Sequence, residues 1–278
     1  MRSTGRLLRA LLVHAVLLAG AVFVVAPFVW MLATSVKPPE EVFSATLRLL
    51  PERFYGTENY AAAMTRAPLL RFALNGVVVC AGILAVQLLC AIPCAYALAK
   101  LRFPGRRVLF LLVLLALAIP VQVPALPLYI ALAEADLLNT YFSLMLPFFF
   151  SAFAIFLLRQ FFRSFPDDII HAARLDGVGE LEIVWRIVVP SAWPAIAAFS
   201  VFSVVAHWND YFWLLIAVGD QSLYTPPLGI AFFRLNDQGT DYGALMAAAT
   251  LVIAPLVVAF LFAQRRFIEG ITFTGMKR

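Results

Sequence analysis

The chain has 278 residues, of which 63% are hydrophobic and 13% are charged, and its mean hydropathy is +0.91. An ordinary soluble domain is about 45–50% apolar and about 25% charged, and a water-soluble fold of this size needs a polar surface. The composition therefore excludes a soluble enzyme, a disordered chain and a secreted disulfide scaffold, and it predicts an integral membrane protein.

Six runs without Lys, Arg, Asp or Glu are long enough to cross a bilayer, because a spanning helix needs about 20 residues. Their apolar residues are continuous rather than alternating, which favours helices. The fifth span is expected to continue past Asp210. We predict an all-α, multi-pass protein in a single domain over residues 1–278, with six transmembrane helices at about 10–36, 72–99, 108–133, 137–158, 194–218 and 242–264.

The basic residues divide unevenly between the two sides of this predicted bundle. Of the 21 Lys and Arg residues, 15 lie at the two termini and in the second and fourth connections. Basic residues accumulate on the cytoplasmic side of membrane proteins, so both termini are predicted to be cytoplasmic. Nucleic-acid binding is not expected, because no basic run is interleaved with aromatic residues.

No pattern in the sequence indicates a metal site, a cofactor or a catalytic centre. Cys80, Cys90 and Cys94 lie in the second span without CxxC spacing or a cluster of histidines, which is typical of small packing residues. A phosphate-binding GxxxxGK[ST] loop is absent from the sequence, and so is any grouped set of catalytic residues. We therefore expect no metal, no cofactor and no enzyme activity in this chain, ATP hydrolysis included.

The fourth connection, residues 159–193, is too long for a simple turn. Ser164 and Asp167 have the spacing of a capping box, and Gly177 is a candidate stop, which together predict a short helix over 166–177. Its face of aliphatic residues and alanine favours a docking helix for a cytoplasmic protein. The alternative is an interfacial helix that lies on lipid.

Two further places in the spans are candidates for a translocation path. Prolines 120, 124 and 127 surround Gln122 in the third span and should kink or unwind the helix there. Such a break lines a watery path or is buried between helices. In the fifth span, Asp210 is an intramembrane carboxylate beside Trp208 and Asn209, which indicates either a solute contact or a structural polar contact between helices.

The fourth connection also resembles the signature loop of the membrane subunits of binding-protein-dependent ABC importers. That signature reads Glu-Ala-Ala, three residues, Gly, nine residues, Ile, one residue, Leu-Pro. Here residues 171–173 read His-Ala-Ala, Gly177 follows after three residues, and Ile-Val-Val-Pro (187–190) follows after nine more. The spacing is that of the family, while His171 stands in place of its Glu and Val189 in place of its Leu.

Other segments resemble the carbohydrate-uptake branch of this family, of the maltose and glycerol-phosphate types. They are TSVKPPEEVF (34–43), AYALAKLRFPGRR (95–107), LNTYFSLMLP (138–147), HWNDYFWLL (207–215) and QRRFIEGITFTGMKR (264–278). The resemblance implies the type I permease fold of ABC importers, with six transmembrane helices and a cytoplasmic coupling helix. It also implies a bacterial or archaeal cytoplasmic (inner) membrane.

What the resemblance implies about function is a permease subunit of an ATP-driven importer. The expected partners are a second homologous permease subunit in a heterodimer, two cytoplasmic ATP-binding subunits, an extracytoplasmic solute-binding protein and membrane lipid. The solute would be a sugar or a related polar molecule, and its identity is not specified by the sequence.

In this family the loop helix sits in a groove on the ATPase and transmits its closure to the membrane helices. By resemblance, the coupling contacts are His171, Ala172, Ala173, Arg174, Asp176 and Gly177. The tail of the family reaches the ATPase dimer, and the corresponding residues here are Gly270, Gly275 and Lys277.

A self-contained secondary carrier, or an enzyme embedded in the membrane, is the alternative interpretation. Carriers usually place several ionisable groups or paired discontinuous helices near the midplane, whereas this chain has one intramembrane carboxylate and one proline-rich break. The two interpretations differ in whether the purified protein moves solute without an ATPase.

Overall fold

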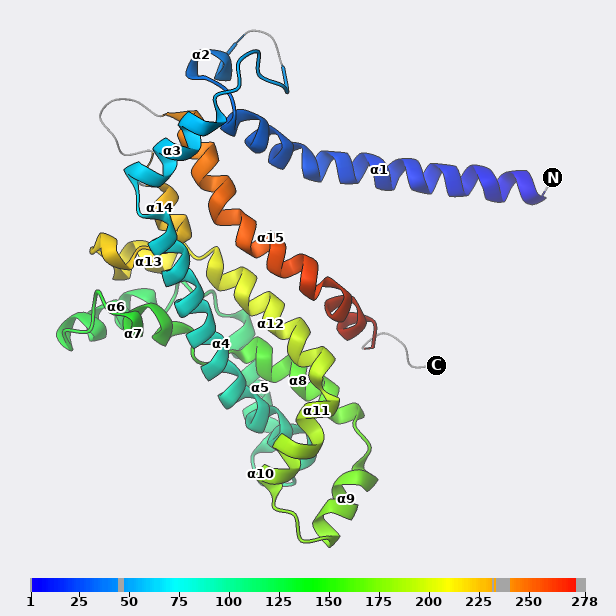
Figure 1. Cartoon of the computed structure of the whole chain (residues 1–278). Helices are drawn as coiled ribbons and strands as arrows, with labels where there is room; N and C mark the ends of the chain where they lie inside the picture. Colours follow the sequence, from blue (N-terminus) through cyan, green and yellow to red (C-terminus); the bar gives the residue numbers. More distant parts are fainter. Residues whose placement is uncertain (1, 45–47, 232, 234–240, 274–278) are drawn as a thin grey trace. The chain divides into compact units, whose positions relative to one another are not determined.

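The structure is a computed structural model, and every regular element that it describes is a helix (Figure 1). The described residues are 2–44, 48–231, 233 and 241–273. The chain forms two compact units, which consist of residues 1–69 with 230–254 and of residues 70–229 with 255–278.

Three helices in the described residues are long and apolar enough to cross a membrane without interruption. They are α1 (Arg2–Ser35), α4 (Leu69–Lys100) and α15 (Tyr242–Phe273). These helices contain the predicted second and sixth spans and all but the last residue of the first. Both α1 and α15 extend past the predicted limits, because a helix satisfies its own backbone hydrogen bonds and can continue outside the apolar region.

The other three predicted spans are interrupted. The third contains α5 (Arg106–Ala118) and α6 (Ala125–Glu134), the fourth contains α7 (Tyr141–Met145), η1 (Leu146–Phe148) and α8 (Ala152–Ser164), and the fifth contains α12 (Trp193–Trp208) and α13 (Phe212–Ala217). The described helices give up to five spans when each bent pair is counted once. The number six therefore stays a prediction.

The break in the third run lies at its first two prolines, as the sequence predicts. The helix ends at Ala118 and resumes at Ala125, so Pro120 and Pro124 both lie in the interruption. Pro127 behaves differently and lies inside α6. It stands in the first turn of that helix, where the backbone N–H groups have no partner within the helix, so a missing N–H does not interrupt it.

The first unit is organised around the end of α1. Its other elements are α2 (Pro39–Val42), α3 (Gly56–Arg66) and the beginning of α15. Asn59 of α3 donates from Nδ2 to the carbonyl oxygens of Ser35 (3.0 Å), the last residue of α1, and of Lys37 (2.8 Å), which lies just after that helix. Arg66 and Asp241 form an ion pair of 2.8 Å. A buried amide and a surface ion pair thus tie the three segments together.

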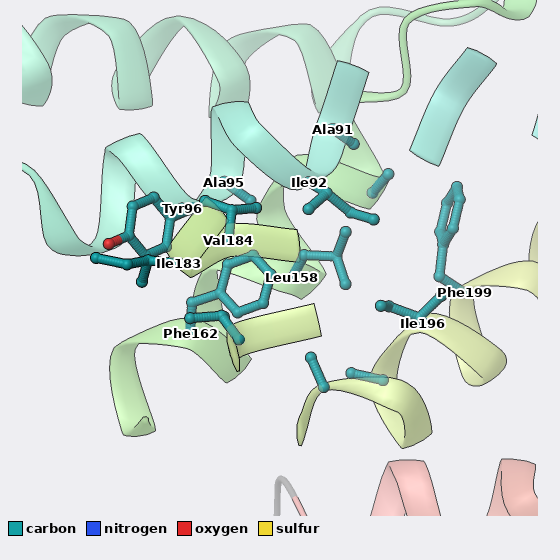
Figure 2. Close-up of a cluster of buried hydrophobic side chains, with 14 of the residues drawn as sticks. Ala91, Ile92, Ala95, Tyr96, Leu158, Phe162, Ile183, Val184, Ile196 and Phe199 are labelled. Carbon is teal, nitrogen blue, oxygen red and sulfur yellow. The ribbon is translucent and has the colours of Figure 1, made fainter. Parts of the chain in front are cut away.

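The second unit has two apolar clusters, both built on α4. One surrounds the C-terminal half of α4 and contains side chains of α8, of α12 and of the helical stretch before it (Figure 2). The other surrounds the N-terminal half and contains side chains of α6, α7 and α13. The remaining elements are α9 (Asp167–Leu175), α10 (Glu180–Glu182), the π-helix η2 (Ile183–Val188), α11 (Val189–Ser191), η3 (Gln221–Leu223) and α14 (Pro226–Ala231).

A buried polar group on α4 supports the bend in the fourth predicted span, where α7 and η1 meet α8 at 48°. Gln87, which is 3% exposed, donates from Nε2 to the carbonyl oxygen of Phe148 at the end of η1 (2.8 Å). Ser203 of α12 donates to Gln87 Oε1 (2.6 Å), and His207 Nε2 lies 3.2 Å from Gln87 Nε2. Since lipid offers no hydrogen bonds, a bent backbone needs a protein donor of this kind.

We expect Gln87→Leu to lower the free energy of unfolding by about 1–3 kcal/mol, because it leaves the Phe148 carbonyl and the Ser203 hydroxyl without their partner. Gln122→Leu is the matched control, since the Gln122 side chain is exposed and has no hydrogen-bond partner among the described residues. Its effect should stay within about 0.5 kcal/mol. Thermal unfolding of the purified protein in detergent measures both. Equal midpoints for the two variants would contradict this role of Gln87.

Candidate functional site

The long loop of residues 159–193 contains the short helix that its sequence predicts, α9 (Asp167–Leu175). Pro166 precedes it in an extended conformation, and two aspartates occupy its first turn, where the helix dipole favours negative charge. The predicted capping box is wrong. Ser164 instead donates to the carbonyl oxygen of Phe161 (2.7 Å), because α8 continues through Ser164 and the hydroxyl bonds within that helix.

Gly177 ends α9, which confirms the predicted stop. Its φ is +79°, in the left-handed region. The Gly177 N–H donates to the carbonyl oxygen of Arg174 (3.1 Å), and the Val178 N–H donates to that of Ala173 (3.0 Å). This is the Schellman arrangement, in which a glycine reverses the chain and satisfies the last carbonyls. The helix is therefore bounded by a proline and a glycine over fewer than three turns.

The two faces of α9 have different surroundings. Ile170 and Ala173 are buried in the apolar cluster around the C-terminal half of α4. On the opposite face, Leu175 is 89% exposed and Ala172 is exposed, and Ile169 at the edge of the buried face is about half exposed. One apolar face therefore anchors the helix, while the other is left uncovered by the described part of the chain.

The last residue of α4 holds the beginning of α9. Lys100 Nζ donates to the carbonyl oxygen of Phe165 (2.6 Å) and to Asp167 Oδ1 (2.6 Å). The Lys100 side chain is only 6% exposed, and an ammonium group that is removed from water needs such partners. The hydrogen bond from Lys100 lowers the pKa of Asp167, so this carboxylate is ionised at neutral pH.

A second polar contact joins α4 to the end of α9, one helical turn before Lys100. The Tyr96 hydroxyl donates to Glu180 Oε2 (2.8 Å), and Arg174 Nε donates to Glu180 Oε1 (2.6 Å). In Figure 2 the Tyr96 ring lies at the edge of the apolar cluster, close to Ile183, with its hydroxyl directed away from the cluster. One carboxylate thus links α9 to the transmembrane helix.

The charges of this contact are stable near neutral pH. The hydrogen bond from Arg174 lowers the pKa of Glu180, burial opposes this effect, and the Tyr96 hydroxyl adds to it. A carboxyl group whose pKa is lowered on folding stabilises the fold above its unfolded pKa, near 4. This contribution is lost only as the pH falls through the lowered value, so both carboxylate contacts of α9 persist at physiological pH.

The candidate coupling residues divide between the two faces of α9 and its C-terminal turn. Ala173 lies in the apolar cluster, and Arg174 is turned to Glu180. His171, Ala172, Asp176 and Gly177 are exposed. The four exposed residues are therefore available to a partner protein, whereas Ala173 and Arg174 hold the helix against its own chain.

Three residues of this contact were missed by reasoning from the sequence, namely Tyr96, Lys100 and Glu180. The signal for the first two is their spacing, because residues four apart lie on one face of a helix, here at its charged end. Nothing in the sequence pairs Glu180 with Tyr96, since 84 residues separate them.

Most of the predicted tail contacts lie outside the residues that the structure describes. Gly270 lies near the end of α15, whereas Gly275 and Lys277 lie outside the described residues. Their contact with an ATPase stays a prediction.

The candidate path residues lie at two breaks. Asp210 stands between α12 and α13, where Oδ1 accepts from the Trp213 N–H (3.4 Å). Asp210 Oδ2 and Trp208 Nε1 are buried, and neither has a hydrogen-bond partner among the described residues. Asn209 is exposed and donates to the carbonyl oxygen of Val205 (2.7 Å). Gln122 is exposed at the other break, and no hydrogen bond in the described chain joins it to these residues.

We expect Gly177→Ala to loosen the end of α9 by about 1–2 kcal/mol, because alanine is strained at a positive φ. Gly179→Ala is the matched control, since its φ is −71° and a Cβ there meets nothing within 4 Å. Amide hydrogen exchange over 167–178 should rise in the first variant and stay unchanged or fall in the second. The same exchange in both variants would contradict the assigned role of Gly177.

Comparison with known proteins shows the family and the fold of the chain. Residues 87–272 match the family described as "Binding-protein-dependent transport system inner membrane component". A chain in the crystal structure of a bacterial ABC transporter involved in the import of the acidic polysaccharide alginate has the same fold. Its TM-score is 0.81 at 24% identity, over 92% of this chain and 95% of that chain.

Curated relatives match over nearly their whole length. The diacetylchitobiose uptake system permease protein NgcG of Streptomyces coelicolor is 34% identical, over 93% of this chain and 86% of the relative. The arabinooligosaccharides transport system permease protein AraQ of Halalkalibacterium halodurans is 32% identical, over 92% of both chains. The sn-glycerol-3-phosphate transport system permease protein UgpE of Yersinia pestis is 31% identical, over 93% and 94%. This chain therefore belongs to the inner membrane component family of binding-protein-dependent transport systems.

Proposed function

We propose that the chain is a permease subunit of an ATP-driven importer and forms half of the translocation path for a sugar or a related polar solute. Support comes from family membership and from relatives named as permeases for oligosaccharides and for sn-glycerol-3-phosphate. The partners are a second permease subunit, two cytoplasmic ATP-binding subunits, an extracytoplasmic solute-binding protein and membrane lipid. The 15 basic residues on one side of the predicted bundle support cytoplasmic termini.

The observation that carries this proposal is the uncovered apolar face of α9. Leu175 and Ile169 are exposed on a helix that is otherwise well anchored. Exposed apolar contacts on an ordered helix are typical of a surface that meets a partner. In the proposed complex this face occupies a groove of an ATP-binding subunit, and His171 and Asp176 lie at the rim of the contact.

The anchored face of α9 explains how a movement of the ATPase reaches the membrane. When the ATP-binding subunits close, α9 moves with them and pulls on its two polar attachments, one at each end of the helix. Lys100 holds the first turn through Asp167, and Tyr96 holds the last turn through Glu180. Both attachments lie on the final turns of α4, so the displacement passes directly to a transmembrane helix. The bundle then alternates between inward-open and outward-open states.

For the solute path we propose the break between α12 and α13. The Asp210 carboxylate and the Trp208 indole N–H each have a buried polar atom available. A carboxylate acceptor beside an aromatic ring suits the hydroxyl groups and the apolar faces of a sugar. Asn209 and Gln122 are the other candidate contacts, from two different breaks. The alternative role of Asp210 is a structural polar contact to the partner permease. A variant Asp210→Asn with unchanged solute affinity would favour that alternative.

We expect Leu175→Ser to weaken binding of the ATP-binding subunits, because burying a leucine contributes about 1.5–3 kcal/mol. That loss corresponds to a decrease in affinity of about tenfold or more. Leu181→Ser is the matched control, since Leu181 is an exposed leucine of the same loop outside α9. The amount of ATP-binding subunit that copurifies with the permease measures the effect, and full retention by the Leu175 variant would speak against docking through α9.

We expect Glu180→Gln to lower the amount of solute imported per ATP hydrolysed, because it weakens the link from α9 to Tyr96 and Arg174. Glu182→Gln breaks only an exposed ion pair with Arg186, four residues away on the same stretch, and should behave as wild type. Solute transport and ATP hydrolysis are measured together in proteoliposomes that contain the complete transporter and are supplied with the solute-binding protein. Solute movement by this chain without ATP-binding subunits would favour a secondary carrier.

A further inference from the structure

A polar cavity of about 560 Å³ lies between the end of α4, the start of α5, the end of α8 and α9. Its charged lining is strongly one-sided. Among the described residues, Asp167 alone contributes a carboxylate to the lining. The basic lining residues are Lys100, Arg102, Arg106, Arg163, His171 and Arg174.

The carboxylates near this cavity do not neutralise it. Asp167 is paired with Lys100, and Glu180 is paired with Arg174. Within the described chain, the Arg106 side chain donates to a neutral group, the carbonyl oxygen of Leu101 (2.8 Å), and has no carboxylate partner. Arg102 and Arg163 have no carboxylate partner among the described residues. Three guanidinium groups therefore face one small volume without a counter-charge within the described chain.

The gathering of three arginines around one cavity is more than the general excess of basic residues on one side of a membrane protein. Arg107 belongs to the same connection as Arg102, and Arg186 belongs to the same loop as Arg163, yet neither lines the cavity. Arg107 is exposed, and Arg186 forms an exposed pair with Glu182. The lining arginines thus differ from their neighbours in position rather than in charge.

We propose that this cavity binds a phosphate-type oxyanion. Guanidinium groups bind phosphate oxygens through two parallel N–H bonds, and several of them around one volume lose their mutual repulsion when an anion enters. The cavity lies where the apolar stretch of α4 ends, which is the depth of the lipid head groups. Basic pockets at this depth bind the phosphodiester of anionic lipids from the adjacent leaflet. Inorganic phosphate from solution presents the same oxygens.

A bound oxyanion would add charged contacts between elements that Lys100, Glu180 and the apolar cluster already join. Arg102 and Arg106 flank the turn between α4 and α5, Arg163 ends α8, and His171 belongs to α9. An anion held by these groups braces α9 against three other helices. The anion therefore makes the position of α9 depend on lipid composition or on phosphate concentration.

The test uses the complete transporter with its partner subunits, in nanodiscs of phosphatidylcholine. Dioleoylphosphatidylglycerol is titrated in, and the number of retained lipids is counted by native mass spectrometry. We expect the double variant Arg102→Gln, Arg163→Gln to bind phosphatidylglycerol about tenfold or more weakly, the loss expected for hydrogen bonds to a charged group. The matched double variant Arg107→Gln, Arg186→Gln removes the same charge from the same two connections and should bind as wild type.

Inorganic phosphate, titrated by calorimetry in phosphatidylcholine alone, separates the two sources. Phosphate binding that only the lining variant loses, without retained phosphatidylglycerol, assigns the site to a soluble anion. Equal losses in both double variants overturn the proposal, and so does a wild-type protein that binds neither probe. Arg163→Gln alone, which changes one exposed side chain at the end of α8, repeats the comparison with Arg186→Gln if the double variant does not assemble.

Discussion

The polar attachment of α9 to the last turns of α4 is the contact on which the rest of this site depends. Lys100 and Tyr96 lie one turn apart on α4, and each reaches a different end of α9, directly or through Glu180. The side chains of Lys100 and Tyr96 are almost fully buried, so the loss of a carboxylate partner leaves a buried polar group unpaired. The carboxylates of Asp167 and Glu180 are themselves partly exposed to water. A short helix that would be unstable alone in water is thereby given a definite position.

The same principle governs the interior of the second unit. Each helix that bends or ends within an apolar layer leaves backbone carbonyl or amide groups without helical partners. Asparagine and glutamine side chains supply those partners. Gln87 donates to the end of η1, Asn75 donates to two carbonyl oxygens beside η3, and Asn139 accepts from the Gly219 and Asp220 amides. At these three places the interruption of regular helix is tolerated because an amide side chain satisfies the freed backbone groups.

The apolar surface of the chain has two different explanations. Along α1 the most apolar stretch is not buried by the rest of the described chain, which is normal for a helix that meets lipid or another membrane subunit. Leu175 on α9 is equally exposed, yet it lies on a charged loop beside aspartates and arginines. An apolar side chain in that setting fits a protein partner, and the surrounding charges are suited to the rim of such a contact.

The sequence by itself determined the local features of this protein. Uncharged runs marked the apolar helices, Pro120 and Pro124 marked a break, and Gly177 marked the end of α9, because hydrophobic length and backbone stereochemistry are properties of neighbouring residues. The resemblance in residues 171–190 indicated the family. The tertiary structure alone decided that Ser164 belongs to α8, that Ala173 and Arg174 face inward, and that Tyr96 meets Glu180. It also gathered Arg102, Arg106 and Arg163 around one cavity. Such pairings join residues that are distant in sequence, and only the packing of helices against each other brings their side chains within bonding distance.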